Sequence, residues 1–187
     1  MKRLLSIFLA VLLLAALLSG CTQGSAQNQK SALFEEVVVQ TEEGFTFTGL
    51  DWSMTKDEVM EKLGVSADTV GADLEDRFTV AVHSDELNAD GWATYVFISG
   101  DEPLCAGWYY FPVNDGDGEE KIWSKVKEMA LTCLPEPETE WKQGESMKWE
   151  GADGSTVSVL FNAVENAPEG TYPVTLEVSC PPIPSDE

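Results

Sequence analysis

The chain has 187 residues, and its 33 Asp and Glu against 11 Lys and Arg give a formal net charge of −22 at pH 7. A field this negative repels phosphate backbones and anionic lipid headgroups, which excludes nucleic-acid binding and membrane attachment through a basic face. The length suits one ordinary domain with a core large enough to fold alone.

The first residues have the pattern of a secretory signal. Lys2 and Arg3 form a short basic start, residues 4–18 are an almost unbroken apolar run, and small residues close it. This is the order of regions in a signal peptide. The apolar run has 15 residues, fewer than the roughly 20 that a helix needs to cross a bilayer core, so a mature transmembrane span is not expected.

The run closes with Leu18-Ser19-Gly20-Cys21, which resembles the lipobox of bacterial prolipoproteins. The resemblance implies that residues 1–20 are a lipoprotein signal peptide and that Cys21 carries a diacylglyceryl group on its thiol. Two acyl chains are enough for stable anchoring. The alternative is an ordinary signal peptide that happens to be followed by a cysteine.

Composition divides the rest of the chain into three parts. Residues 21–32 are mostly small and polar with no apolar period, which predicts a flexible tether. Residues 33–182 are expected to form a single domain. Two prolines stop its last strand, and residues 183–187 are expected to be a disordered tail.

The domain is predicted to open with two strands. Residues 34–40 contain three consecutive valines and predict the first strand. In residues 45–48, two phenylalanines alternate with two threonines, as in a half-buried strand. The Thr-Glu-Glu-Gly sequence at residues 41–44 predicts the turn between them.

Residues 54–64 carry the clearest helix signals. Thr55 and Glu58 have the spacing of a capping box. The first turn is acidic and Lys62 lies in the last turn, and both favour the helix dipole. Gly64 is expected to end the helix.

The same stretch carries a second resemblance. Residues 47–55 read Phe-Thr-Gly-Leu-Asp-Trp-Ser-Met-Thr, and Leu-Gly follows at 63–64. This is similar to the helix opening of small bacterial lipoproteins with a β-lactamase-inhibitor-like fold, where Gly-Met-Thr and Leu-Gly bracket the helix. Ser53 stands where their glycine usually does. The resemblance implies an interaction module and not an enzyme.

Three strands are predicted next. Residues 78–83 alternate between apolar and polar, residues 92–99 are denser in apolar residues and suit a central strand, and residues 104–111 form the third. The Asp-Gly signal within residues 88–91 predicts a hairpin between the first two.

A second helix is predicted from near Glu119 to Pro135, because apolar residues repeat at helical spacing from Ile122 to Cys133. Three strands follow, near Met147, over residues 157–161 and over residues 174–180. The resulting order is β-β-α-β-β-β-α-β-β-β. This order predicts an α+β fold with an antiparallel sheet and two helices on one of its faces.

Three cysteines remain once Cys21 is assigned to lipid, and the extracytoplasmic side permits disulfides. Cys133 continues the apolar stripe of the second helix, and Cys180 has the apolar parity of the last strand. We therefore expect a Cys133–Cys180 disulfide with Cys105 free. Three reduced core cysteines are the alternative.

The chain offers few residues for catalysis or metal binding. Cys105 and the single histidine, His83, are the conceivable thiol–imidazole pair, but a buried strand cysteine and a strand-end histidine are the favoured explanation. Asp115, Asp117 and Glu119 imitate only the start of a calcium loop. We predict no catalytic, metal-binding or cofactor-binding residue, and no cofactor.

We expect a non-catalytic binding or interaction module that Cys21 anchors to the extracytoplasmic side of the cell membrane, with a protein or cell-envelope ligand as partner. The alternatives are a cell-envelope hydrolase using a carboxylate pair, and a carbohydrate- or solute-binding lipoprotein using exposed tryptophans. Core packing is the plain explanation of the six tryptophans, which are Trp52, Trp92, Trp108, Trp123, Trp141 and Trp149.

Overall fold

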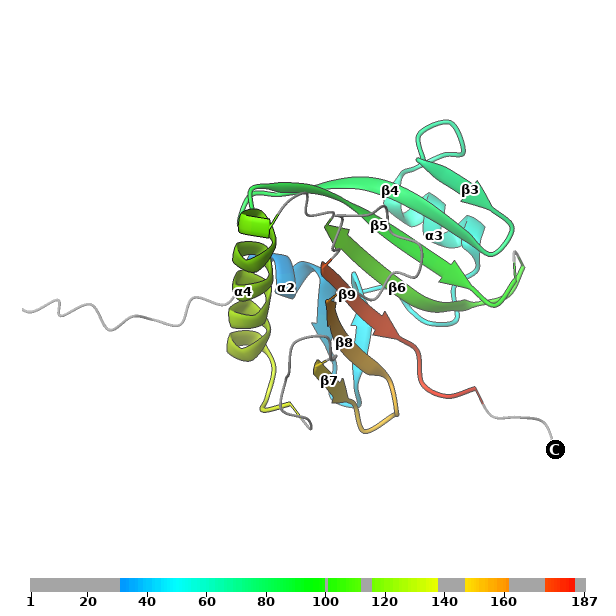
Figure 1. The fold of residues 1–187 in the computed structure, drawn as a ribbon. Coiled ribbons are helices and arrows are strands. Elements are labelled where there is room, and N and C mark those ends of the chain that lie inside the picture. The colour runs from blue at the N-terminus through cyan, green and yellow to red at the C-terminus, as the bar shows by residue number, and fades with distance from the viewer. Residues whose placement is uncertain (1–30, 100, 112–115, 138–146, 162–173, 184–187) are drawn as a thin grey trace, which may run out of the picture.

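The computed structural model describes residues 31–99, 101–111, 116–137, 147–161 and 174–183. These residues form an α+β fold with a seven-stranded antiparallel sheet and a separate two-stranded hairpin (Figure 1). The helices are α2 (Ala32–Val37), α3 (Lys56–Leu63) and α4 (Gly116–Cys133). The strands are β1 (Val38–Gln40), β2 (Phe45–Phe47), β3 (Ala72–Leu74), β4 (Arg77–Ser84), β5 (Ala89–Phe97), β6 (Leu104–Phe111), β7 (Met147–Glu150), β8 (Thr156–Phe161) and β9 (Val174–Ser179).

The sheet has the order β3-β4-β5-β6-β9-β8-β7, and every neighbouring pair is antiparallel. The strands after α4 therefore join those before it through the pairing of β6 with β9, which lie side by side in Figure 1. The predicted fold class is confirmed. The element order gains α2 at the start and the short edge strand β3.

The β1–β2 hairpin packs on one face of the large sheet, called here the core face. The ring of Phe47 lies between Tyr95 and Tyr109, at ring-centroid distances of 5.1 and 5.8 Å. Directly beneath it is Gly107, where a Cβ atom would overlap the Phe47 ring. The glycine thus allows the hairpin to close on the sheet. The two predicted opening strands are therefore antiparallel partners, but they do not belong to the main sheet.

Both long helices cover this same face, as predicted. Val59 of α3 and Val126 and Ala130 of α4 are buried in one hydrophobic cluster with Leu176 of β9. Burying a side chain of this kind stabilises the fold by roughly 1.5–3 kcal/mol relative to leaving it in water. The core thus lies between the helices and hairpin on one side and the sheet on the other.

The first element differs from its prediction. The predicted strand over residues 34–40 is mostly the helix α2, and only its end is a strand. Ser31 caps α2 by accepting the Phe34 N–H at 3.2 Å, and the Glu86 carboxylate accepts two more N–H groups of the first turn at 3.1 Å. Glu86 follows β4, so a residue far along the chain satisfies the free donors of this helix end.

The domain also begins slightly earlier than predicted. Ser31 is only 5% exposed and Ala32 opens α2, so these two residues of the predicted tether belong to the domain. The predicted signal peptide, Cys21 and the rest of the tether lie outside the described residues, as do residues 184–187. Within the described part of the chain, no helix is both long and apolar enough to cross a membrane.

The helix α3 has the predicted ends. The capping box is formed, and the Thr55 N–H donates to the Glu58 carboxylate at 2.9 Å. This hydrogen bond lowers the pKa of Glu58. Gly64 ends the helix in the left-handed conformation, with φ of 67°.

The hairpin β4–β5 is present, but its predicted turn is wrong. Asp90 and Gly91 lie within β5, where Asp90 pairs with His83, and the turn precedes them with Asn88 at φ of 50°. Gly91 is needed for a different reason, because a Cβ atom there would collide with the carbonyl oxygen of Tyr110.

Candidate binding face

The face of the sheet opposite the core, called here the outer face, carries an aromatic group on its central strands. Successive side chains of a strand point to opposite faces. Tyr95 and Tyr109 face the core, so Trp92 of β5 and Trp108 and Tyr110 of β6 face outward. Trp92 lies directly opposite Tyr110, and Trp108 is its diagonal neighbour. These three residues are the aromatic face.

Trp92 is the exposed member of the aromatic face. Its side chain is 41% exposed, whereas Trp108 and Tyr110 are half-buried. Gly71 lies against the edge of the Trp92 ring and is held there because its N–H donates to the Thr79 carbonyl at 2.8 Å. A residue with a side chain would displace the ring. The chain therefore supports Trp92 on one side and leaves much of its surface to solvent.

Polar residues of β9 border the aromatic face. Glu177 lies opposite Trp108, and Thr175 lies opposite Tyr110. The Ser179 hydroxyl donates to the Glu177 carboxylate at 2.9 Å and orients it. The arrangement is an aromatic surface with a carboxylate and hydroxyl groups at its edge, which is the composition of many sites that bind polar, ring-shaped ligands.

Two polar atoms of this region have no hydrogen-bond partner within the described structure. They are the buried Nε1 of Trp108 and the Oγ1 of Thr175, whose residue is 8% exposed. A buried polar group without a partner costs about 1–3 kcal/mol.

The conceivable thiol–imidazole pair is not assembled. His83 lies opposite Asp90 on the outer face, whereas Cys105 lies at the other end of the sheet, beside the end of β5. From Asp90 to Val96 the strand advances six positions, which at about 3.3 Å each separates His83 from Cys105 by roughly 20 Å. His83 instead binds Asp90, with Nδ1 and Oδ1 2.7 Å apart, and this hydrogen bond raises the pKa of His83.

The predicted Cys133–Cys180 disulfide is absent, and all three described cysteines are free. Cys133 ends α4 and its sulfur accepts the Ser31 N–H at 3.3 Å. Cys180 follows β9, and its N–H donates to the carbonyl of Cys105 at 2.9 Å. Cys133 packs against the core cluster as expected, but the pairing of β6 with β9 gives Cys180 a different neighbour, Cys105.

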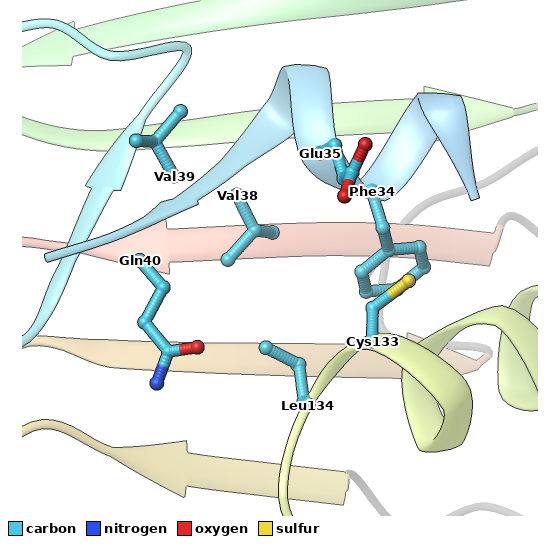
Figure 2. Close-up of a pocket in the computed structure, with 7 residues that line it drawn as sticks. All are labelled: Phe34, Glu35, Val38, Val39, Gln40, Cys133 and Leu134. Carbon is cyan, nitrogen blue, oxygen red and sulfur yellow. The ribbon is translucent and has the colours of Figure 1, made fainter. Parts of the chain in front are cut away.

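A small cavity of about 270 Å³ lies between α2, β1 and the end of α4 (Figure 2). In Figure 2 the Cys133 side chain lies beside the Phe34 ring, while Val38 and Leu134 complete the apolar wall. This volume is slightly below the usual range of ligand pockets, about 300–1,000 Å³. We interpret this cavity as a packing gap at the end of α4.

A wider, open groove of about 610 Å³ separates α3 from β3 and is the place to seek a carboxylate pair. Asp57 and Glu61 line it from α3, and Asp73 and Glu75 line it from the other side. Lys56 also lines the groove and forms an ion pair with Asp73, so part of the negative charge of the groove is neutralised by the protein itself.

Carboxylate chemistry of the glycosidase type also needs a general acid with a raised pKa. Among the described carboxyl groups with a resolved change, the pKa is lowered in every case. Hydrogen bonds from neighbouring groups lower it for Asp51, Glu58 and Asp76, and for Glu86 they outweigh the opposing effect of burial. Each of these four groups is suited to remain ionised and accept hydrogen bonds, and not to donate a proton.

The other tryptophans hold the fold together. The indole N–H groups of Trp52 and Trp149 donate to the carbonyls of Phe45 and Pro135, at 3.0 and 2.7 Å. Trp123 of α4 is half-buried against the core cluster. Trp141 and the predicted start of a calcium loop at Asp115 lie outside the described residues, and the side chains of Asp117 and Glu119 are not described either.

Comparisons with the models of protein families, with curated proteins and with solved structures found no match for this chain.

Proposed function

We propose that this chain is a non-catalytic binding module of the cell envelope, anchored through lipid on Cys21, and that its aromatic face binds an uncharged glycan. The observation that carries the proposal is Trp92, a large aromatic side chain that is 41% exposed on a central strand of the sheet. The lipobox-like ending at Cys21 supports the location, which stays a prediction.

The chemistry of the face favours a sugar over a protein surface. A protein partner of standard size buries about 800 Å² on each side around a cluster of aromatic anchors. Here only one ring is well exposed, with half-buried aromatic neighbours and a carboxylate, Glu177, oriented by Ser179. One open ring suits the apolar face of a pyranose, and the polar rim suits its hydroxyl groups.

The charge of the protein restricts the ligand further. A chain of net charge −22 repels acidic polymers. Uncharged glycans are therefore the expected ligands.

The test is a titration of residues 31–187, which contain every element described above, with uncharged oligosaccharides built from hexose or N-acetylhexosamine units. Tryptophan fluorescence and calorimetry report the binding. Trp92→Ala should weaken binding at least tenfold, about 1.4 kcal/mol, and Trp92→Phe should retain part of it because a ring remains.

The matched control is Leu131→Ala. Leu131 is also a large exposed apolar residue, at 46%, but it lies on α4 and not on the aromatic face. Its loss should leave the affinity unchanged. If the domain bound no glycan but bound an envelope protein in a way that required Trp92, the glycan proposal would be wrong and the ligand would be a protein. Release of reducing ends by the purified domain would contradict the non-catalytic role.

A further inference from the structure

Cys105 and Cys180 occupy facing positions on two paired strands. Ala106 of β6 pairs with Ser179 of β9, so the next position toward the end of the ladder places Cys105 opposite Cys180. The Cys180 N–H donates to the Cys105 carbonyl at 2.9 Å and holds the two backbones together there. These residues are 75 positions apart in the sequence numbering, and only the β6–β9 pairing brings them together.

Both thiols lie at the same end of the sheet, one at the start of β6 and one just after the end of β9. Facing residues of an antiparallel pair project to the same side, so the two side chains are neighbours. Each cysteine is half-buried, so the sulfur atoms are shielded but not enclosed. Burial raises the pKa of each thiol, and for Cys105 the proximity of Cys180 raises it further.

The spacing of facing residues is close to that of a disulfide. Directly opposite side chains in an antiparallel pair have Cβ atoms about 4.5–5.5 Å apart. A disulfide needs Cβ atoms about 3.5–4.5 Å apart and Cα atoms within about 4.4–6.8 Å. The two strands must therefore approach by up to about 1 Å for the sulfur atoms to bond.

The backbone is least constrained where this approach is needed. Val96 pairs with Ala106 and Phe97 with Leu104, so Cys105 is the extra residue of a β-bulge and has no partner on β5. Cys180 lies just beyond the last residue of β9 and is followed by Pro181, which cannot donate a hydrogen bond to a ladder. Within the described sheet, neither cysteine is paired with residues of two neighbouring strands, so each can shift without disrupting a strand pair on its other side.

We propose that Cys105 and Cys180 form a reversible cross-strand disulfide and constitute a thiol–disulfide exchange site. The oxidant is an external disulfide, either a small molecule or a protein. A thiolate of the pair attacks one external sulfur, expels the other as a thiolate and forms a mixed disulfide. The second cysteine thiolate attacks the protein sulfur of that bond and expels the remaining external thiolate.

The step balances without a further reagent. The two cysteines lose two electrons to the external disulfide, which becomes two thiols and takes up the two protons that the cysteines release. The bond links the start of β6 to the end of β9 and fixes the C-terminal strand to the centre of the sheet. Because closure requires the strands to approach, the bond is expected to be readily reduced.

The experiment exposes the full purified chain, in detergent if it carries lipid, to oxidised glutathione and to oxidised dithiothreitol. Mass spectrometry of the unreduced digest should then show a peptide pair joined through Cys105 and Cys180, lighter by two hydrogen atoms, with Cys133 still open to alkylation. Dithiothreitol should remove the link. The oxidised protein should melt roughly 5–10 °C higher, since its unfolded chain carries a long closed loop.

Two variants decide whether the pair acts as a unit. Cys133→Ser should leave the link unchanged, and Cys105→Ser should abolish it and leave Cys180 only as a mixed disulfide with glutathione. A Cys133–Cys180 link, links only between molecules, or stable glutathione adducts on both cysteines of the wild-type chain would each overturn the proposal. The wild-type oxidation is decisive even if a variant folds poorly.

Discussion

The two faces of the seven-stranded sheet are built on different principles, although they share the same strands. On the core face, rings of Phe47, Phe78, Tyr95 and Tyr109 contact one another at centroid distances of 4.8–5.8 Å. On the outer face, Trp92 presents much of its ring to water. The same residue class thus maintains the fold on one face and is available for contact on the other.

The difference shows which aromatic residues can be changed without unfolding the protein. An aromatic residue that is enclosed stabilises the fold through its buried area and its neighbours. An aromatic residue that is exposed contributes less to stability, so it can be changed with little effect on folding. In our proposal, this exposed ring contacts the glycan.

The largest expected difference between the faces is in stability. Phe47→Ala should lower the free energy of unfolding by about 3–5 kcal/mol, because it empties a fully buried site between two tyrosine rings. Trp92→Ala, the matched change on the outer face, should lower it by less than about 1 kcal/mol. Urea unfolding followed by circular dichroism measures both. Equal losses would show that Trp92 belongs to the core.

A second difference should appear at alkaline pH. Burial raises the pKa of Tyr95 and of Tyr109 on the core face. A phenol whose pKa is higher in the folded state contributes stability that is fully present below its unfolded pKa of about 10 and is lost as the pH rises beyond it. The free energy of unfolding should therefore decrease as the pH rises above about 10. Tyr109→Phe should reduce the decrease, and an unchanged slope in this variant would argue against the assignment.

The smallest expected effect is on the outer face. The pKa of His83 is raised chiefly by its hydrogen bond with Asp90, so this pair stabilises the fold fully below about pH 6.5 and progressively less as the pH rises through the folded pKa. An NMR titration of the imidazole should give a pKa above about 6.5. Asp90→Asn should bring it back toward that value. A wild-type pKa at or below 6.5 would mean that the pair does not form in solution.

Sequence patterns predicted the elements whose signals are local. The helix α3 carries its own capping box at Thr55 and Glu58 and its own stop at Gly64, so the neighbouring residues contain all that its ends require. Strands β8 and β9 have apolar residues at every second position, and they formed where this pattern predicted them.

The helix α2 could not be predicted in this way, because its end is satisfied from a distance. Three adjacent valines favour a strand, yet Leu33, Phe34 and Val37 face the core from a helix. Glu86 supplies part of the cap, and no local pattern links it to this helix.

The aromatic face was obscured by an irregularity of β6. Leu104 is buried in the core, and counting by twos from it would place Trp108 and Tyr110 in the core as well. The bulge at Cys105 reverses the parity, so both residues face outward. A bulge changes which face a side chain occupies without changing the composition of the strand, so the composition of β6 did not indicate it.

By itself, then, the sequence determined the α+β class, the helix α3 and the strands of the sheet other than β3, because alternation, helical spacing and capping act over a few residues. Only the tertiary structure decided that β6 pairs with β9 and that Cys105 faces Cys180 where Cys133 had been expected. Pairing between strands far apart in the chain depends on the combined fit of their side chains and on the entropy of closing the intervening loop. Neither quantity can be read from the residues of one strand alone.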